Sequence, residues 1–219
     1  MDLEKFQNDV FAMFDKLSKN LQDHDKSRLR YVCNQLIEMY KKNLVKINHS
    51  VLEIICASSL IARGYSIEVE KSVSDILVCD IYAKKGGGYT IIEIETGFTP
   101  PEHAMDTLDY FTARLVSKIA RYSQHCSKFS LATPAIDVLP IPKIFLLPPN
   151  ARKKNDVDNV KKLCDRYYKN PSIKYDDILN AHLHSIYLIN IDGGFSKEID
   201  PQGYIDLTKD LLTRSEIGY

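Results

Sequence analysis

The chain has no excess of charge of either sign, because 29 lysines and arginines are matched by 29 aspartates and glutamates. A nucleic-acid-binding protein of this composition must gather its positive charge locally. The chain also has no tryptophan and no long hydrophobic run. Its longest apolar segments, such as residues 51–55 and 144–149, are far shorter than the roughly 20 residues that a membrane-spanning helix needs. We therefore expect no membrane partner.

The five cysteines include no C-x-x-C pair and are scattered along the chain. This spacing is typical of neither a zinc ribbon nor a disulfide framework. Because no secretory signal pattern is present at the N-terminus, we expect reduced thiols and a cytoplasmic protein. Hydrophobic residues make up 44% of the chain and charged residues 26%, which excludes a disordered or low-complexity protein.

The first part of the chain has the pattern of a helical hairpin. Apolar residues recur every three or four positions over residues 3–21 and again over residues 29–40, with a polar break between them. We expect this hairpin, residues 1–48, to pack on a core formed by residues 49–219. A core-covering role is favoured over a role in dimerisation alone.

The remaining segments alternate between helical and strand patterns. A third helix is predicted from Ser50, where Ser50 and Glu53 have the spacing of a capping box, to Gly64. Strands are predicted over residues 65–71, 76–83, 89–96, 143–147 and 185–191, and further helices over residues 102–126, 155–168 and 205–212. This order predicts an α/β fold with a mixed β-sheet flanked by helices and preceded by the hairpin.

Acidic side chains interrupt two apolar strands. Asp80 lies in one of them, and Glu93 and Glu95 lie in the return strand after a glycine-rich turn. Strand pairing brings such residues together, and buried carboxylates are costly unless they are paired or bind a cation. Hard oxygen ligands suit Mg²⁺ or Mn²⁺. The alternatives are a hydrogen-bonded strand end for Asp80, a solvated strand face for the two glutamates and a capping role for Glu53.

Residues 50–135 resemble the PD-(D/E)XK nuclease superfamily. The resemblance depends on the helix with Glu53, the strand with Asp80, the glycine turn and the sequence Ile92-Glu93-Ile94-Glu95. Within the superfamily the pattern is most similar to archaeal Holliday-junction-resolvase-like members, and would suit a protein of an archaeon or of an archaeal spindle-shaped virus. The resemblance implies a restriction-endonuclease-like core.

The resemblance also implies roles for individual residues. Asp80 and Glu93 would be the metal ligands, with the Ile94 carbonyl as a further ligand. Glu53 matches the acidic residue that holds a metal-bound water or a second metal. The implied cofactor is Mg²⁺ or Mn²⁺, and the implied reaction is metal-assisted phosphodiester hydrolysis.

The chain departs from the superfamily at the motif's lysine. That lysine should stand two residues after Glu93, where this sequence has Glu95. The resemblance implies that a basic residue of a neighbouring helix replaces it, with Lys118 as the candidate and Lys71 as the weaker alternative. A two-metal site, in which Glu95 helps to neutralise a second cation, is the other interpretation.

Two basic segments are candidates for contact with nucleic acid. The first is a set of residues at helical spacing in a stretch, from residue 112 to 132, that has no acidic side chain. The second is a basic cluster that runs from residue 152 to 174. The candidate residues are Arg114, Lys118, Arg121, Lys153 and Lys154. An ordinary solvated helix face is the alternative for both segments.

Together these patterns predict a metal-dependent DNA endonuclease that acts on structured or branched DNA. We expect a homodimer, because the two cuts of a junction need two sites, and a location in the cytoplasm, or in the host cytoplasm if the chain is viral. The alternative is a non-catalytic DNA-binding or assembly protein that retains the nuclease fold. A third interpretation, an interaction module with coincidental acidic strands, predicts no affinity for metal or nucleic acid.

Overall fold

A computed structural model describes residues 3–209 and residue 211 of the chain. Its helices are α1 (Leu3–Ser18), α2 (Asp23–Lys41), α3 (Ile47–Ala62), α4 (Thr107–Tyr122), α5 (Lys154–Tyr167), α6 (Tyr175–Asn180) and α7 (Pro201–Thr208). Its strands are β1 (Ser66–Ser72), β2 (Val78–Lys85), β3 (Gly88–Ile94), β4 (Lys128–Pro134), β5 (Ser185–Asn190) and β6 (Phe195–Ile199). None of the described helices combines the length and the hydrophobicity needed to cross a membrane.

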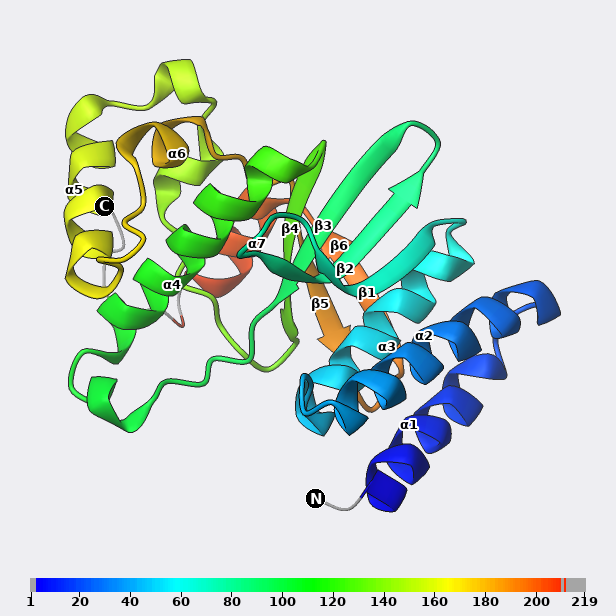
Figure 1. Cartoon of the computed structure of the whole chain (residues 1–219). Coiled ribbons are helices and arrows are strands. Elements are labelled where there is room, and N and C mark those ends of the chain that lie inside the picture. Colours follow the sequence, from blue (N-terminus) through cyan, green and yellow to red (C-terminus); the bar gives the residue numbers. More distant parts are fainter. Residues whose placement is uncertain (1–2, 210, 212–219) are drawn as a thin grey trace.

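The strands form one six-stranded sheet in the order β1-β2-β3-β4-β5-β6. β4 pairs in parallel with both β3 and β5, and the other neighbouring strands pair antiparallel. Helices α1 to α3 lie on one side of the sheet and α4 to α7 on the other (Figure 1). The predicted α/β class, with a mixed sheet between helices and an N-terminal helical hairpin, is confirmed.

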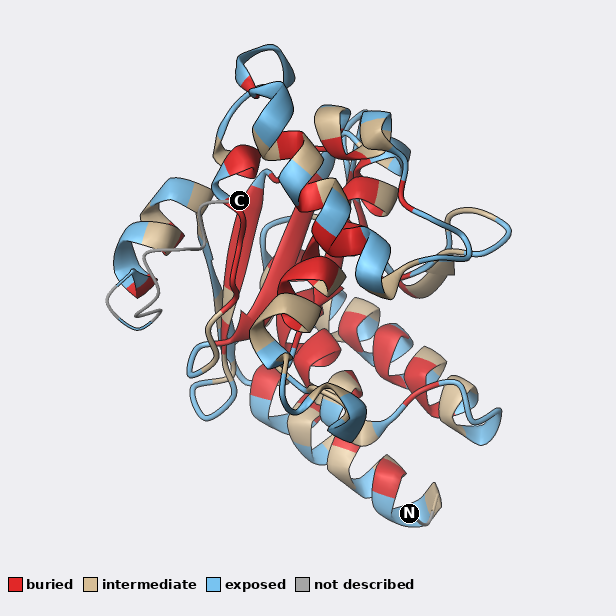
Figure 2. Cartoon of the chain, turned by 90° about the vertical axis from the view of Figure 1, so that its left-hand side faces the viewer, coloured by how far each residue is buried: buried red, intermediate tan, exposed pale blue. Residues whose placement is uncertain are grey.

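Two apolar clusters fill the space between the sheet and its helix layers. One joins α1, α2 and α3 to Ile81, Ile92 and Ile94, and the other joins α4 to α7 to Ile91 and Phe129. Each fully buried aliphatic or aromatic side chain of this kind contributes about 1.5–3 kcal/mol to the free energy of unfolding. Figure 2 shows the central strands of the sheet as largely buried, between helices whose outer faces are exposed. The carboxylates of Asp80 in β2 and Glu93 in β3 are therefore largely shielded from water.

The N-terminal hairpin shares its apolar cluster with α3. Phe6 and Val10 of α1 and Leu29 and Leu36 of α2 are fully buried in the same cluster as the side chains of α3. The expected division of the chain at residue 48 falls in the first turn of α3, which begins at Ile47. The hairpin thus covers the helix that carries Glu53 and completes its burial.

Some predicted elements were wrong. The strand expected over residues 143–147 is a 3₁₀ helix, Lys143–Leu146, because prolines at 140, 142, 148 and 149 flank it and cannot donate to a strand ladder. The helix expected over residues 102–126 is shorter: α4 begins at Thr107, beyond the 3₁₀ turn Pro101–His103, and ends at Tyr122. β4, β6 and α6 were not predicted. α7 begins at Pro201, earlier than the predicted residue 205, and residues 210 and 212 of that prediction lie outside the described residues.

Candidate functional site

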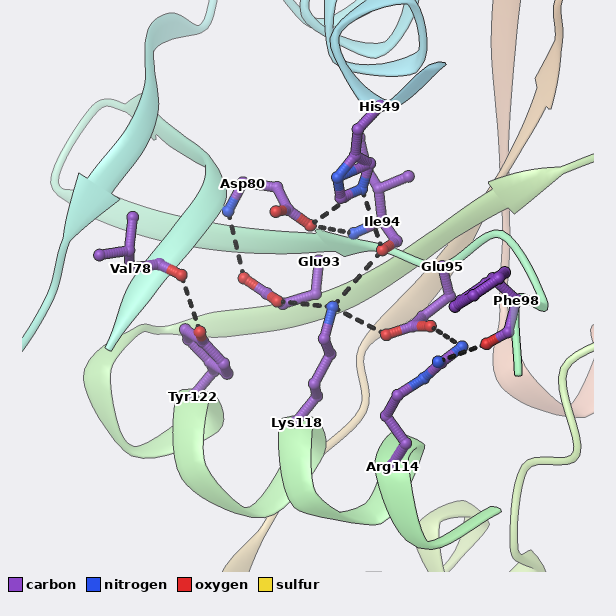
Figure 3. A network of polar contacts seen from close by, with 10 residues as sticks. All are labelled: His49, Val78, Asp80, Glu93, Ile94, Glu95, Phe98, Arg114, Lys118 and Tyr122. Atoms are coloured by element: carbon purple, nitrogen blue, oxygen red, sulfur yellow. Dashed lines mark hydrogen bonds and ion pairs between the residues drawn. The ribbon is translucent and has the colours of Figure 1, made fainter. Parts of the chain in front are cut away.

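Asp80 and Glu93 face each other where β2 and β3 separate. The ladder between these strands reaches Ile81 and Ile92, and the next two residues replace backbone pairing with side-chain contacts. The Asp80 N–H donates to Glu93 Oε1 at 3.2 Å, and the Ile94 N–H donates to Asp80 Oδ2 at 2.5 Å (Figure 3). The two residues are 8% and 2% exposed. The two buried carboxylates therefore lie together, and hydrogen bonds from the backbone of Asp80 and Ile94 fix them.

Lys118 reaches this pair from α4. Its Nζ lies 3.0 Å from Glu93 Oε2 and 2.7 Å from Glu95 Oε1, and it donates to the Ile94 carbonyl at 3.4 Å (Figure 3). Burial lowers the pKa of the ammonium, but attraction to the three nearby carboxylates outweighs it, so the pKa lies well above its ordinary value. Lys118 is thus a fixed, charged group beside Glu93.

Glu95 is neutralised by protein cations. It follows β3, and its N–H donates to the Ala132 carbonyl at 2.8 Å, which extends the pairing of β3 with β4. One carboxylate oxygen contacts Lys118, and the other lies 2.8 Å from Arg114 Nη2. Arg114 Nη1 also donates to the Phe98 carbonyl at 2.6 Å. This arrangement favours Glu95 as the anchor of Lys118 over Glu95 as a ligand of a second metal.

Glu93 and Glu53 differ from ordinary surface carboxylates. Burial and then the neighbouring charge of Asp80 raise the pKa of Glu93, and Lys118 partly offsets this rise. Glu53 is fully buried, and neither of its carboxylate oxygens has a hydrogen-bond partner among the described residues. Its pKa is raised well above the ordinary value by burial, followed by the charges of Asp80, Glu70 and Glu93. Burial and the neighbouring negative charges therefore both favour the protonated form of Glu53.

The capping-box interpretation of Ser50 and Glu53 is wrong. α3 begins one turn earlier, with Lys46 as its N-cap, so both residues lie inside the helix and are buried. A glutamate in the helix interior has no free backbone N–H to accept from at that point. The position of Glu53 is therefore explained by the carboxylate group that it joins rather than by the helix end.

Two residues of the site were missed by the sequence analysis. Glu70 lies in β1 between the residues paired with Ile81 and Cys79, and its φ of 48° places it in the left-handed region. Burial, followed by the charge of Asp80, raises its pKa to about 7. His49 lies in the first turn of α3, four positions before Glu53, which is the one sequence signal that places both residues on one helix face.

A divalent cation at this site would need several oxygen ligands close together. Among the described residues, no three His, Cys, Asp or Glu side chains are grouped closely enough to hold a metal ion by themselves. Mg²⁺ is commonly bound by one or two carboxylates, with water and phosphate oxygens completing its coordination. Asp80, Glu93 and the Ile94 carbonyl fit that pattern. The two carboxylate oxygens of Glu53, which have no hydrogen-bond partner among the described residues, are further polar atoms of the site.

The structure separates the candidate nucleic-acid contacts into residues that are engaged within the chain and residues that are exposed. Arg114 contacts Glu95, and Arg121 donates to the Pro171 carbonyl at 2.7 Å and lies over the ring of Tyr168, so both are engaged within the chain. Lys118 belongs to the carboxylate site. Lys153 and Lys154 precede and begin α5, outside this site, and both are exposed. Lys154 contacts Asp158 at 3.1 Å.

Arg152, at the start of the second basic cluster, is a structural residue. It is 8% exposed, and its guanidinium donates to backbone carbonyls at 2.7–3.1 Å. The acceptors are Leu147, Ile178, Leu179 and Ala181. The sequence alone does not distinguish a buried arginine that bonds to backbone carbonyls from a surface arginine that binds phosphate. The burial of Arg152 shows that it is the former.

The protonation of Glu53 has a measurable consequence for stability. Below its ordinary pKa of 4.5 the carboxyl is protonated in both the folded and the unfolded chain. As the pH rises past that value, the unfolded chain loses this proton before the folded chain does, so the free energy of unfolding falls. We expect Glu53→Gln to remove this fall.

The measurement is urea unfolding of the wild type and of Glu53→Gln from pH 5.5 to 7.5. The stability of the variant relative to the wild type should rise with pH over that range, by at most about 1.4 kcal/mol per pH unit, which is the limit for one proton. The exposed Glu102→Gln is the control and should follow the wild type. Parallel curves for Glu53→Gln and the wild type would mean that Glu53 is ionised in the folded chain.

Comparison with known proteins identifies no relative of the chain. No protein-family model, no curated protein and no solved structure matches the chain. The function is therefore argued from the site itself.

Proposed function

We propose that the chain is a metal-dependent endonuclease that hydrolyses phosphodiester bonds in structured or branched DNA. The observation that carries the proposal is the contact of Lys118 Nζ with Glu93 at 3.0 Å. It supplies a cation from α4 beside the motif whose own lysine is replaced by Glu95. The resemblance to the PD-(D/E)XK superfamily supports the proposal through Asp80 and Glu93, which lie together as that motif requires.

Asp80, Glu93 and the Ile94 carbonyl would hold the Mg²⁺ or Mn²⁺. A divalent cation bound there would polarise the scissile phosphate and lower the pKa of a bound water. The chain contributes the geometry: the hydrogen bonds between Asp80 and the Ile94 N–H and between Glu93 and the Asp80 N–H keep both carboxylates at the ends of adjacent strands. Such preorganisation avoids rearrangement during the reaction.

Lys118 would supply a positive charge in the site, and Glu53 would position a water. The ammonium of Lys118 keeps its proton and would donate a hydrogen bond to a phosphate oxygen or hold the attacking water in position. Glu53, whose pKa is raised by burial and whose two oxygens are unpartnered among the described residues, would hold a water on the other side of the carboxylates. Glu95 and Arg114 would act as positioning residues, because their contacts fix the place of Lys118.

DNA and a second copy of the chain are the proposed partners, and the cytoplasm, or the host cytoplasm for a viral chain, is the proposed location. The exposed Lys153 and Lys154 would contact phosphates without reading sequence. A two-fold symmetric dimer would present two sites, one for each strand to be cut at a junction.

One observation favours a second candidate function. Lys118 and Arg114 already neutralise Glu93 and Glu95, so part of the acidic group is balanced by the chain itself. This balance suits a non-catalytic DNA-binding or assembly protein that retains the nuclease fold. Such a protein would bind DNA without needing a divalent cation.

Cleavage assays distinguish the two functions. Labelled four-way junction, flap, single-stranded and linear duplex DNA are incubated with the purified protein in Mg²⁺, Mn²⁺ or EDTA. The proposed nuclease cuts the branched substrates in the presence of either metal and leaves all of them intact in EDTA. DNA binding without cutting under every condition would favour the non-catalytic function, and the absence of both would contradict both candidates.

A further inference from the structure

Two loops leave the sheet side by side, next to the carboxylate site. They follow the carboxyl ends of β3 and β4, which are parallel neighbours. A Cβ atom added to Gly97 in the first loop would lie 3.9 Å from Asp137 Cγ in the second, so the two loops are in contact. The residues next to this contact are apolar and exposed, Phe98 by 65% and Ile136 by 90%. In open α/β sheets, ligands commonly bind outside the carboxyl ends of the strands.

The backbone of Phe98 is fixed to the carboxylate site. Arg114 Nη1 donates to the Phe98 carbonyl at 2.6 Å, and Arg114 Nη2 lies 2.8 Å from Glu95 Oε2 (Figure 3). The other oxygen of Glu95 contacts Lys118. Gly97, just before Phe98, has a φ of 67°, which glycine adopts at little cost. A single guanidinium therefore holds Phe98 beside the charged groups of the site.

Packing does not explain the exposure of the Phe98 ring. Among the described residues, the ring belongs to neither of the two apolar clusters that fill the interior. Exposed apolar surface that borders polar residues marks binding sites for ligands. A nucleic-acid strand with one phosphate at Asp80 and Glu93 carries bases on either side of that phosphate. A base is therefore the part of the proposed substrate that suits this ring.

We propose that Phe98 stacks on an unpaired base of the strand that the site would cut, and that this contact selects strands with unstacked bases. The inference rests on the proposed function and names its substrate class. An aromatic ring can stack on any base, because every base has a π face. In a continuous duplex those faces are occupied by neighbouring bases, whereas bases in single strands, loops and ends can be splayed out. Phe98 thus recognises the structure of the DNA and not its sequence.

The test measures binding separately from cutting. Fluorescence anisotropy is recorded for the full chain with a labelled single strand, a four-way junction and a blunt duplex, in Ca²⁺ so that a divalent cation is present. We expect Phe98→Ala to weaken binding of the single strand and of the junction by about 5- to 150-fold, which is the range for the loss of one stacked base. Binding of the blunt duplex should stay at the wild-type level.

Two further substitutions at the same position identify stacking as the cause. Phe98→Trp keeps an aromatic face and should bind the single strand at least as tightly as the wild type. Phe98→Leu keeps an apolar side chain without a π face and should behave like Phe98→Ala. Met105→Ala is the matched control, because Met105 is fully exposed in the same loop and has no ring. It should bind all three DNA forms like the wild type.

Three results would overturn the stacking contact. Wild-type affinity of Phe98→Leu for the single strand would mean that only apolar packing is needed. Equal weakening on the single strand and on the duplex would mean that the ring does not distinguish them. A change of oligomeric state in Phe98→Ala, measured by sedimentation, with unchanged DNA affinity would assign the ring to a protein interface.

The outcomes also separate this inference from the proposed function. If the wild type cuts junctions and Phe98→Ala binds and cuts them equally well, the nuclease stands and the role of Phe98 is overturned. If single-strand binding depends on Phe98 but no substrate is cut in Mg²⁺ or Mn²⁺, the stacking contact stands and the endonuclease is wrong. If the wild type binds none of the three DNA forms, both are overturned.

Discussion

Replacing Lys118 by methionine is expected to lower the free energy of unfolding by about 3 kcal/mol. The substitution keeps the length of the side chain but leaves Glu93 and Glu95, which are 2% and 4% exposed at their side chains, without their shared cation. Breaking a buried ion pair from one side costs about 3–5 kcal/mol. We expect the lower end of that range because Arg114 still contacts Glu95.

Urea unfolding at pH 7 in EDTA measures this loss in the absence of metal. Lys71→Met is the matched control, because Lys71 also contacts a glutamate, Glu68, at 2.6 Å but at the surface. Exposed pairs contribute at most about 1 kcal/mol, so this variant should stay close to the wild type. Equal losses in the two variants would mean that burial does not strengthen the Lys118 network. The double variant Lys118→Met with Glu95→Gln should recover part of the loss.

Exchanging the charges of Glu95 and Lys118 is expected to restore activity that either single change removes. Lys118→Glu places a third carboxylate beside Glu93, and Glu95→Lys places two ammonium groups together, so each alone should lower cleavage at least about 100-fold. Glu95→Lys combined with Lys118→Glu returns one cation and one anion to the same 2.7 Å contact, with the lysine now at the motif position.

Initial cleavage rates of the four proteins on one branched substrate measure this exchange. The double variant should cleave at least about tenfold faster than either single variant, because the cation beside Glu93 is restored from the strand. Arg114 contacts Glu95 in the wild type, so the recovery should remain incomplete. A double variant no faster than the single variants would mean that Lys118 does not act as the replacement for the motif's lysine.

The central part of the site was predictable from local sequence patterns. Period-two alternation and the glycine turn predict the β2–β3 hairpin, which is enough to bring Asp80 and Glu93 together. The apolar stripe of α4 fixes which side of that helix faces the sheet and thereby places Lys118 near the strands. These features depend on short-range geometry, so the sequence contains them.

Features set by tertiary contacts were not predictable. α3 begins before the apparent capping box at Ser50, and its first turn has contacts outside the helix: Ile47 packs against the apolar cluster, and His49 Nε2 lies 3.3 Å from the Ile94 carbonyl oxygen. Glu70 adopts a left-handed backbone that no local signal requires of a glutamate. Arg152 has the sequence pattern of a surface charge, but it is buried and donates to the Leu147 carbonyl and to three carbonyl groups that lie 26 to 29 residues away. For α3 and Arg152, contacts that are remote in sequence are absent from any local pattern.

The most direct test of the proposed nuclease is the cleavage of a four-way junction by the wild type and by Asp80→Asn under identical metal concentrations. Asparagine keeps the shape of the side chain but loses the charge that would bind the cation. Asp192→Asn, on the turn between β5 and β6, is the control. The account predicts metal-dependent cutting by the wild type and by the control, and a loss of at least about 1000-fold in Asp80→Asn. Equal cutting by the wild type and by Asp80→Asn would contradict it.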